Sequence, residues 1–335
     1  MDSITHIALG ACVGEILLSK KIGKKALLWG IIAQNLPDID TIPGIFMRGD
    51  RALLFHRGIT HSLFFALVMG LLLAWLAKNL HRKHVLSFAT LAFFFCFQLA
   101  LHDLLDTCNS YGTGLLEPFS HHRFSINLLY VADPLFTIGL VVAALLLIFK
   151  SSKAKNRVRW ATTAIAVSVI YLCFSVINKI NIDSKVDASI KQKNYFTTPA
   201  PFNNMLWYVV ANADSGYYTG YSSVWDKSAI GYGFHPKHDS LLNKSGNISL
   251  KKNLITFADN YYTVTDSGST IYVNILRFEQ VQGWQNTREP FALRYPLSAT
   301  DNENMIIQKG RLTGWNKNTF KLYLERIAGR QTQTK

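Results

Sequence analysis

The chain has 335 residues, of which 49% are hydrophobic, and its formal net charge is +14. A basic chain of this kind fits a nucleic-acid partner or an anionic membrane surface. Long apolar runs favour the membrane, and because the sequence has no arginine-rich arm we expect no nucleic-acid partner. None of the four cysteines lies in a C-x-x-C pair, which excludes a zinc ribbon.

The apolar runs are concentrated in the first half of the chain. Residues 3–18 and 25–36 are short, so they fit half-spans or a packed hairpin. Four longer runs follow, at residues 62–77, 85–105, 134–149 and 160–177. Each of the four is about long enough to cross a hydrocarbon core of roughly 30 Å as a helix. We therefore expect a mainly α fold, in which residues 1–180 form a polytopic transmembrane bundle of about five or six membrane helices.

The positive charges of the connecting loops predict an orientation. The loops "SKKIGKK", "KNLHRKH" and "KSSKAKNRVR" together hold twelve Lys or Arg, whereas the intervening loops hold four. Short loops rich in Lys and Arg remain in the cytoplasm. This pattern predicts a multi-pass protein of the bacterial inner membrane, with everything after about residue 185 on the periplasmic side.

The remainder of the chain, residues 185–335, has the composition of a soluble domain. Alternating patterns at 270–278 and 319–326 predict strands, and "NLITFADNYYTV" at 253–264 predicts another. Residues 214–226 are rich in Tyr, Gly and Ser, as in turns between short strands. We expect a small antiparallel β domain without a recognisable catalytic motif.

Histidines and carboxylates gather at the outer ends of the predicted spans. Imidazole nitrogen and carboxylate oxygen are preferred ligands of zinc and similar divalent ions. Charged groups beside lipid are costly and are candidates for function, and a bound cation would offset the repulsion between the carboxylates. The candidate ligands are His6, Asp38, His56, His61, His102, Asp106, His121 and His122.

Spacing refines some of these candidates. His102 and Asp106 are four residues apart and share one face of a helix. Asp38 and Asp40 follow Pro37, and in an extended segment their side chains would point the same way. The adjacent His121 and His122 would point apart, so we expect one of them, undetermined by the sequence, to be a ligand.

Two further carboxylates have simpler interpretations. Asp133 precedes Pro134, which is the arrangement of a helix cap followed by the first helical residue. Asp103 fits a residue that faces water. We therefore leave both outside the candidate ligand set.

Four motifs carry a family resemblance. "THIALG", "LPDID", "HRGITHS" and "LHDLLDTCNSYGT" resemble those of the bacterial inner-membrane metal-dependent hydrolases of the YdjM type, also labelled LexA-binding. The resemblance covers roughly residues 1–180. A more distant similarity, through the spacing of His102 and Asp106, is to zinc-dependent phospholipase C. It implies a centre of two or three divalent ions, with zinc as the first choice, held by the ligands named above.

These observations predict a membrane-bound phosphoester hydrolase acting on a lipid or lipid-linked substrate at the outer face of the inner membrane. Asp38 or Asp40 would hold or deprotonate a water molecule. Arg57 and Arg123 stand beside the candidate ligands, and a guanidinium group suits phosphate oxygens. The alternative is a metal-binding transporter or sensor without hydrolytic activity. Transport needs polar groups at several depths, and the predicted spans offer chiefly Gln98 and Glu15.

Overall fold

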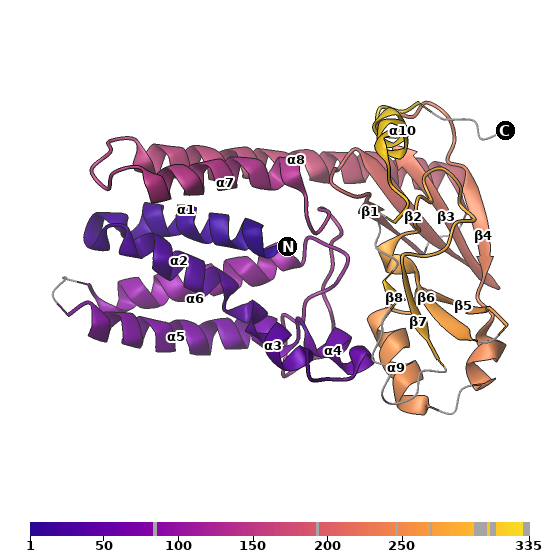
Figure 1. Ribbon diagram of the computed structural model, residues 1–335, viewed down its shortest axis with the longest axis horizontal. Helices are drawn as coiled ribbons and strands as arrows, with labels where there is room; N and C mark the ends of the chain where they lie inside the picture. Colours follow the sequence, from indigo (N-terminus) through magenta and orange to yellow (C-terminus); the bar gives the residue numbers. More distant parts are fainter. Residues whose placement is uncertain are drawn as a thin grey trace. The chain divides into compact units, whose positions relative to one another are not determined.

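The computed structural model divides the chain into two compact units (Figure 1). One unit comprises Met1–Ile45 and Phe55–Phe174, and the other comprises Phe46–Leu54 and Ser175–Lys335. The structure describes residues 1–82, 86–191, 194–244, 247–268, 270–297, 307–308 and 313–330.

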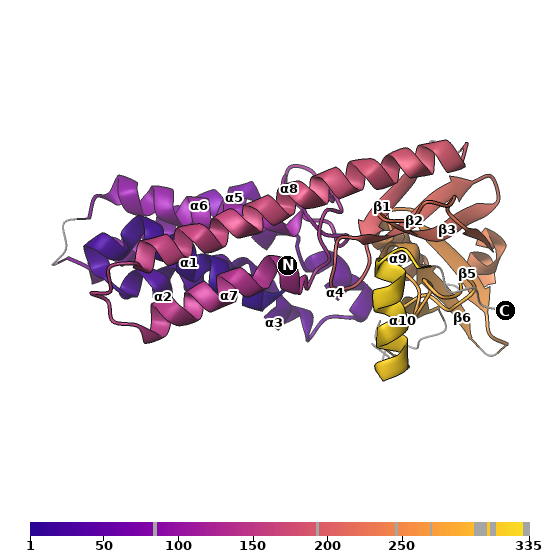
Figure 2. The ribbon, with the colours of Figure 1, turned by 90° about the horizontal axis from the view of Figure 1, so that it is seen from above.

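The first unit is helical, and its helices lie side by side along one direction (Figures 1 and 2). Its elements are α1 (Ser3–Ile22), α2 (Lys25–Asn35), η1 (Pro37–Asp40), α3 (Thr41–Gly44), η2 (Ile59–His61), α5 (Leu63–Leu80), α6 (Phe88–Asp106) and α7 (Pro134–Phe149). The first part of α8 (Arg157–Ser189) also belongs to it. The short α4 (Gly49–Phe55) lies almost wholly in the segment assigned to the second unit.

Side-chain caps fix where four of these helices begin. Each capping oxygen accepts a hydrogen bond from a backbone N–H group of the first turn, which is otherwise unpaired. The caps are Asp2 for α1, Ser62 for α5, Ser87 for α6 and Asp133 for α7. The interpretation of Asp133 as a helix cap is therefore confirmed.

Among the described residues, three helices are long and apolar enough to cross a membrane: α5, α6 and α8. The 16-residue α7 is apolar but shorter. A mainly helical membrane region is thus confirmed for the described part of the chain. The expected total of five or six membrane helices stays a prediction, because length and composition support three candidates.

Glycines allow α1 and α2 to pack at very close range. A Cβ atom added at Gly10 would lie 2.4 Å from the carbonyl oxygen of Gly30, and one added at Gly14 would lie 2.3 Å from that of Ala26. Small residues at such a spacing let helix backbones approach in membrane proteins. This contact brings the C-terminal end of α2, which leads into η1, beside the start of α1.

In the second unit, the described residues form two antiparallel four-stranded sheets, which confirms the expected antiparallel β structure. Their strand orders are β1-β2-β3-β4 and β5-β6-β7-β8. In register, Tyr208 faces Tyr221 and Val273 faces Tyr295. The strands are β1 (Tyr195–Pro199), β2 (Leu206–Ala213), β3 (Gly216–Ser223), β4 (Tyr232–Pro236), β5 (Tyr262–Asp266), β6 (Ile271–Ile275), β7 (Leu293–Pro296) and β8 (Ile307–Gln308).

Two of the strand predictions were wrong in part or in whole. Residues 319–326 form most of α10 (Lys317–Ile327), and residues 253–257 end α9 (Ile248–Phe257). In α9 the buried residues are Leu250, Leu254 and Phe257, which is helical spacing. The prediction at 270–278 was right for β6, after which Leu276–Phe278 forms a single 3₁₀ turn, η4. The remaining 3₁₀ element is η3 (Asp239–Lys244).

Candidate metal centre

The two aspartates after Pro37 do not lie in an extended segment, as the sequence led us to expect. Proline at the first position starts the 3₁₀ helix η1, which carries both of them. A 3₁₀ helix has three residues per turn, so side chains two positions apart point in different directions. Asp38 and Asp40 consequently join two different groups of side chains.

The first group consists of Asp38, His61, His102 and Asp106, from three separate stretches of the first unit: η1, η2 and α6. Nε2 of His61 lies 3.3 Å from Oδ1 of Asp38 and 3.6 Å from Oδ2 of Asp106. Nε2 of His102 lies 3.9 Å from the same Asp38 oxygen and 3.8 Å from the same Asp106 oxygen. Two nitrogens and two oxygens therefore surround one point.

Three of these four atoms lack a hydrogen-bond partner among the described residues: Nε2 of His61, Nε2 of His102 and Oδ2 of Asp106. All three are buried, and buried polar atoms are rarely left unpaired without a reason. The other ring nitrogens are engaged. Nδ1 of His102 donates to the backbone oxygen of Gln34 at 2.6 Å, and Nδ1 of His61 lies 3.4 Å from Oδ2 of Asp40. This leaves both Nε2 atoms as acceptors, the arrangement found in metal-ligating histidines.

The second group, Asp40, His56 and His61, is already satisfied by internal contacts. Asp40 accepts hydrogen bonds from Nδ1 of His56 at 2.8 Å, from the backbone N–H of Arg57 at 3.0 Å and from the hydroxyl of Thr60 at 2.7 Å. Burial alone would raise the pKa of Asp40, but the hydrogen bond from His56 and the nearby imidazoles of His56 and His61 lower it. We infer that Asp40 orients His61 rather than holding an ion itself.

Asp38 is the most open member of the first group. Its side chain is 21% exposed, whereas those of His61 and His102 are 0% exposed. Burial raises its pKa, but the nearby imidazoles, that of His61 above all, outweigh that effect and lower the pKa to about 2. The carboxylate is therefore ionised at neutral pH and is oriented toward the other three groups.

Arg57 is buried beside the first group. Its Nε lies 3.2 Å from Oδ2 of Asp106, and its Nη1 donates to Oδ1 of Asn109 at 2.8 Å. Its guanidinium carbon is 4.9 Å from the centre of the Tyr111 ring. Burial lowers its pKa to about 10, so it is still charged at neutral pH. Its backbone has φ of 62°, a left-handed conformation that is uncommon for a residue with a side chain.

His6 contacts two members of the first group, His102 and Asp106. Its ring stacks on that of His102 with the centroids 3.8 Å apart. Its Nε2 lies 3.3 Å from Oδ1 of Asp106, and its Nδ1 lies 3.2 Å from Oε1 of Gln34. The amino group of Met1 contacts the same Asp106 oxygen. In this arrangement His6 buttresses two candidate ligands.

The structure does not bring Arg123, His121 or His122 into either group. Arg123 donates from both Nη atoms to the backbone oxygen of His56 at 3.2 Å. His121 is 86% exposed and pairs with Glu117 at 2.8 Å. The exposed ring of His122 packs edge-on against Phe124, with the centroids 4.7 Å apart. All three lie in or beside the loop between α6 and α7.

Some residues of the centre were not foreseen. Gln34 forms hydrogen bonds with His6, His102 and Gln98. The feature of the sequence that could have identified it is a polar residue within the apolar helix α2. Asp103 was expected to face water, but it is buried, and its two carboxylate oxygens find no hydrogen-bond partner in the part of the chain that the structure describes. That expectation was wrong because the face of α6 that carries Asp103 is covered by other parts of the protein.

A helical unit with membrane-spanning helices and a buried cluster of imidazoles and carboxylates defines a membrane protein with a candidate metal centre. The chain belongs to the YdjM inner membrane protein family, whose model matches residues 1–182. The resemblance to this family is thereby confirmed, and with it a place among inner membrane proteins.

The chain is also similar to two bacterial proteins over part of its length. The inner membrane protein YbcI of Escherichia coli (strain K12) is 37% identical over 123 residues, which are 36% of this chain and 69% of that protein. The uncharacterized protein YfhP of Bacillus subtilis (strain 168) is 26% identical over 159 residues, or 43% of this chain and 45% of that protein. No solved structure matches the chain.

Proposed function

We propose that this protein is a membrane-bound metal-dependent hydrolase that cleaves a phosphoester of a lipid or lipid-linked substrate at the outer face of the inner membrane. The observation that carries the proposal is the convergence of His61, His102, Asp38 and Asp106. Three of their facing atoms lack a hydrogen-bond partner among the described residues. A divalent cation would pair all of them at once.

The donor set fits zinc. Two imidazole nitrogens and two carboxylate oxygens are ligands of the kinds that zinc accepts in four-coordinate sites. A divalent ion held there supplies Lewis-acid activation of water and of a phosphoryl oxygen. A second ion would have to displace hydrogen bonds in the group of Asp40, His56 and His61, so the first group supports one ion more directly than two or three.

The roles of the neighbouring residues follow from their positions. Asp38 is the candidate ligand that reaches solvent, so it is either the fourth ligand or the base that takes a proton from water. Arg57 offers a buried positive charge beside Asp106, suited to a phosphate oxygen. Asp40 keeps His61 in the required tautomer, and Arg123 holds the backbone at His56.

The alternative is a metal sensor or transporter without hydrolytic activity. The number of protein ligands in the first group is an argument for this alternative. Sites with four protein ligands and no open position are typical of structural zinc. If Asp38 is a fourth ligand, the coordination is filled by the protein and no position is left for substrate. The distinction rests on Asp38.

Elemental analysis and activity assays on the full chain in detergent test the proposal. We expect purified protein to hold zinc and to hydrolyse phospholipids or polyprenyl phosphates, with both properties lost on chelation. His102→Ala should lose the metal and the turnover, while His238→Gln, an exposed histidine of the second unit, should keep both. Equal turnover by His102→Ala would refute the role of the group.

Further variants separate the alternatives. Asp38→Asn should abolish turnover but retain metal if Asp38 is the base, and should lose metal if it is a ligand. His121→Gln and His122→Gln show whether either surface histidine contributes to metal binding. If the protein binds metal without hydrolysing the substrates and takes up metal in proteoliposomes, the proposal of a hydrolase is wrong and the protein is a transporter.

A further inference from the structure

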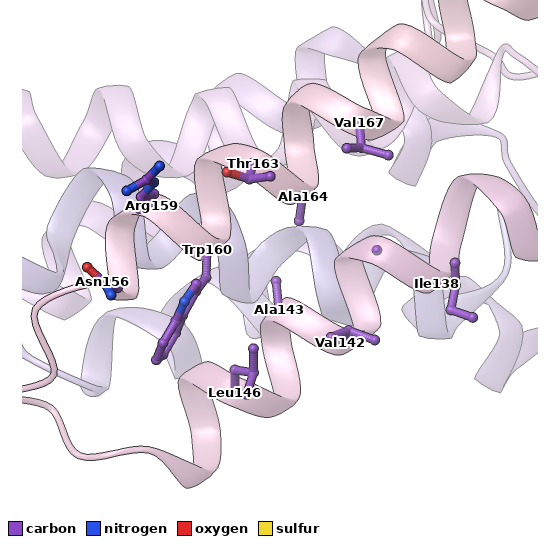
Figure 3. Close-up of a pocket in the computed structure, with 11 residues that line it drawn as sticks. Ile138, Val142, Ala143, Leu146, Asn156, Arg159, Trp160, Thr163, Ala164 and Val167 are labelled. Carbon is purple, nitrogen blue, oxygen red and sulfur yellow. The ribbon is translucent and has the colours of Figure 1, made fainter.

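A groove of about 530 Å³ lies between α7 and α8 in the helical unit (Figure 3). Its volume lies in the range of roughly 300–1,000 Å³ that is usual for ligand sites. The α7 side of the groove is aliphatic, and Trp160 extends from α8 toward Leu146 on α7 (Figure 3). Because α8 is a candidate membrane helix, this part of the groove faces hydrocarbon.

The middle of the groove is open because of a glycine. A Cβ atom built at Gly139 meets nothing within 4 Å. Ile138, Val142 and Val167 along the groove are 62%, 52% and 50% exposed. In a bilayer these side chains contact acyl chains, so the space between the two helices suits a single hydrocarbon chain.

One end of the groove is polar and basic. Asn156 and Arg159 line it at the start of α8, and both are exposed. Lys150, Lys153 and Lys155, in the connection between α7 and α8, are exposed as well. Residues 134–182 contain no Asp or Glu, so the local charge is strongly positive.

The neighbouring Arg157 already forms an ion pair with a carboxylate of the protein. Its Nε and Nη2 contact the carboxylate of Glu15 at 2.9 and 2.7 Å, and both residues are buried. The guanidinium of Arg159 is thus the positive group best placed to receive an anion at the mouth of the groove.

We infer that this groove binds one anionic phospholipid, with an acyl chain between α7 and α8 and its phosphate at Arg159 and Asn156. Basic pockets between membrane helices at the cytoplasmic side are typical sites for anionic headgroups. The connection between α7 and α8 lies at the opposite end of the helical unit from the N-terminus (Figures 1 and 2), whose amino group contacts Asp106. The proposed lipid site is therefore separate from the candidate metal centre.

Native mass spectrometry of the full chain, released from micelles containing phosphatidylglycerol or phosphatidylcholine, tests this inference. We expect the wild type to retain phosphatidylglycerol in preference to phosphatidylcholine. Arg159→Gln should lower the affinity for phosphatidylglycerol about fivefold, which corresponds to one basic residue near a membrane surface. Gly139→Leu should lower retention of both lipids, because its side chain would fill the space for the acyl chain.

Two matched variants serve as controls. Lys78→Gln removes an exposed positive charge from the last turn of α5, and Ala89→Leu adds the same side chain as Gly139→Leu at an exposed position of α6. Both should retain lipid as the wild type does. Equal retention of the two lipids by the wild type, or unchanged retention by Arg159→Gln, would overturn the inference. Because Arg159 lies outside the candidate metal centre, failure here leaves the hydrolase proposal to its own tests.

Discussion

His61 connects the two groups of ionisable side chains because each of its ring nitrogens faces a different one. Nδ1 lies near Asp40, and Nε2 faces Asp38 and Asp106. A carboxylate behind a ligating imidazole fixes its tautomer and raises its basicity. We therefore expect Asp40 to act by orienting His61 and not as a ligand itself, although it lies close to the candidate ligand Asp38 in the sequence.

Replacing Asp40 tests this division of roles. Asp40→Asn should weaken zinc binding by about 10- to 100-fold, the range expected when a partner behind a ligand is lost. The affinity is measured by competition with a chromogenic chelator on the protein in detergent. Asp214→Asn, an exposed carboxylate between β2 and β3, is the control and should bind zinc as the wild type does. An affinity unchanged in Asp40→Asn would show that Asp40 does not orient a ligand.

Helix contacts position the group at the scale of elements. The close approach of α1 and α2 places His6 beside His102 and brings Gln34 within hydrogen-bond reach of both. Gln98 of α6 adds a hydrogen bond to the backbone oxygen of Gly10 at 3.2 Å. The polar residues that the sequence shows inside apolar helices thus connect three helices.

A single methyl group should disturb this contact. A Cβ at Gly30 would lie 2.0 Å from the backbone oxygen of Gly10, so Gly30→Ala should destabilise the protein by about 1–3 kcal/mol, as overpacking does. Unfolding followed by circular dichroism in detergent measures the change. Gly139→Ala, in α7, has room for its Cβ and should be neutral or slightly stabilising. Equal stability of the two variants would show that α1 and α2 separate freely.

The orientation in the membrane belongs to the scale of the whole molecule. Twelve Lys or Arg in one set of loops against four in the other predict which ends of the spans are cytoplasmic. The same prediction would put the candidate metal centre and the second unit on the periplasmic side, and the groove between α7 and α8 at the inner leaflet.

Labelling with a membrane-impermeant maleimide tests this orientation. In a background with Cys12, Cys96, Cys108 and Cys173 replaced, Asn318→Cys should react in intact spheroplasts if the second unit is outside, as the loop charges predict. Lys153→Cys should react only after permeabilisation. Both positions are exposed, so a difference in labelling reports the side of the membrane. The reverse pattern would place the candidate metal centre in the cytoplasm.

Local features of the sequence were sufficient to predict the apolar helices α5, α6 and α8 and the Asp133 cap of α7, because hydrophobicity and capping depend on residues close together in the chain. They were also sufficient to nominate candidate ligands, since imidazoles and carboxylates beside apolar spans are rare. They were insufficient for α10, where the alternation in "TFKLYLER" resembles a strand, although the buried Thr319, Tyr323 and Arg326 have helical spacing.

The tertiary structure decided which candidates meet. Asp38, His61, His102 and Asp106 come from three stretches of chain, and their distances depend on how η1, η2 and α6 pack. Residues that the sequence offered as similar candidates have different positions in the structure. Asp38 faces Nε2 of His61, whereas the nearby Asp40 contacts Nδ1 of the same ring. His121 lies on the surface. Residue type and spacing predict what each side chain can bind, but which of them share one ion depends on contacts between distant segments, which local patterns do not encode.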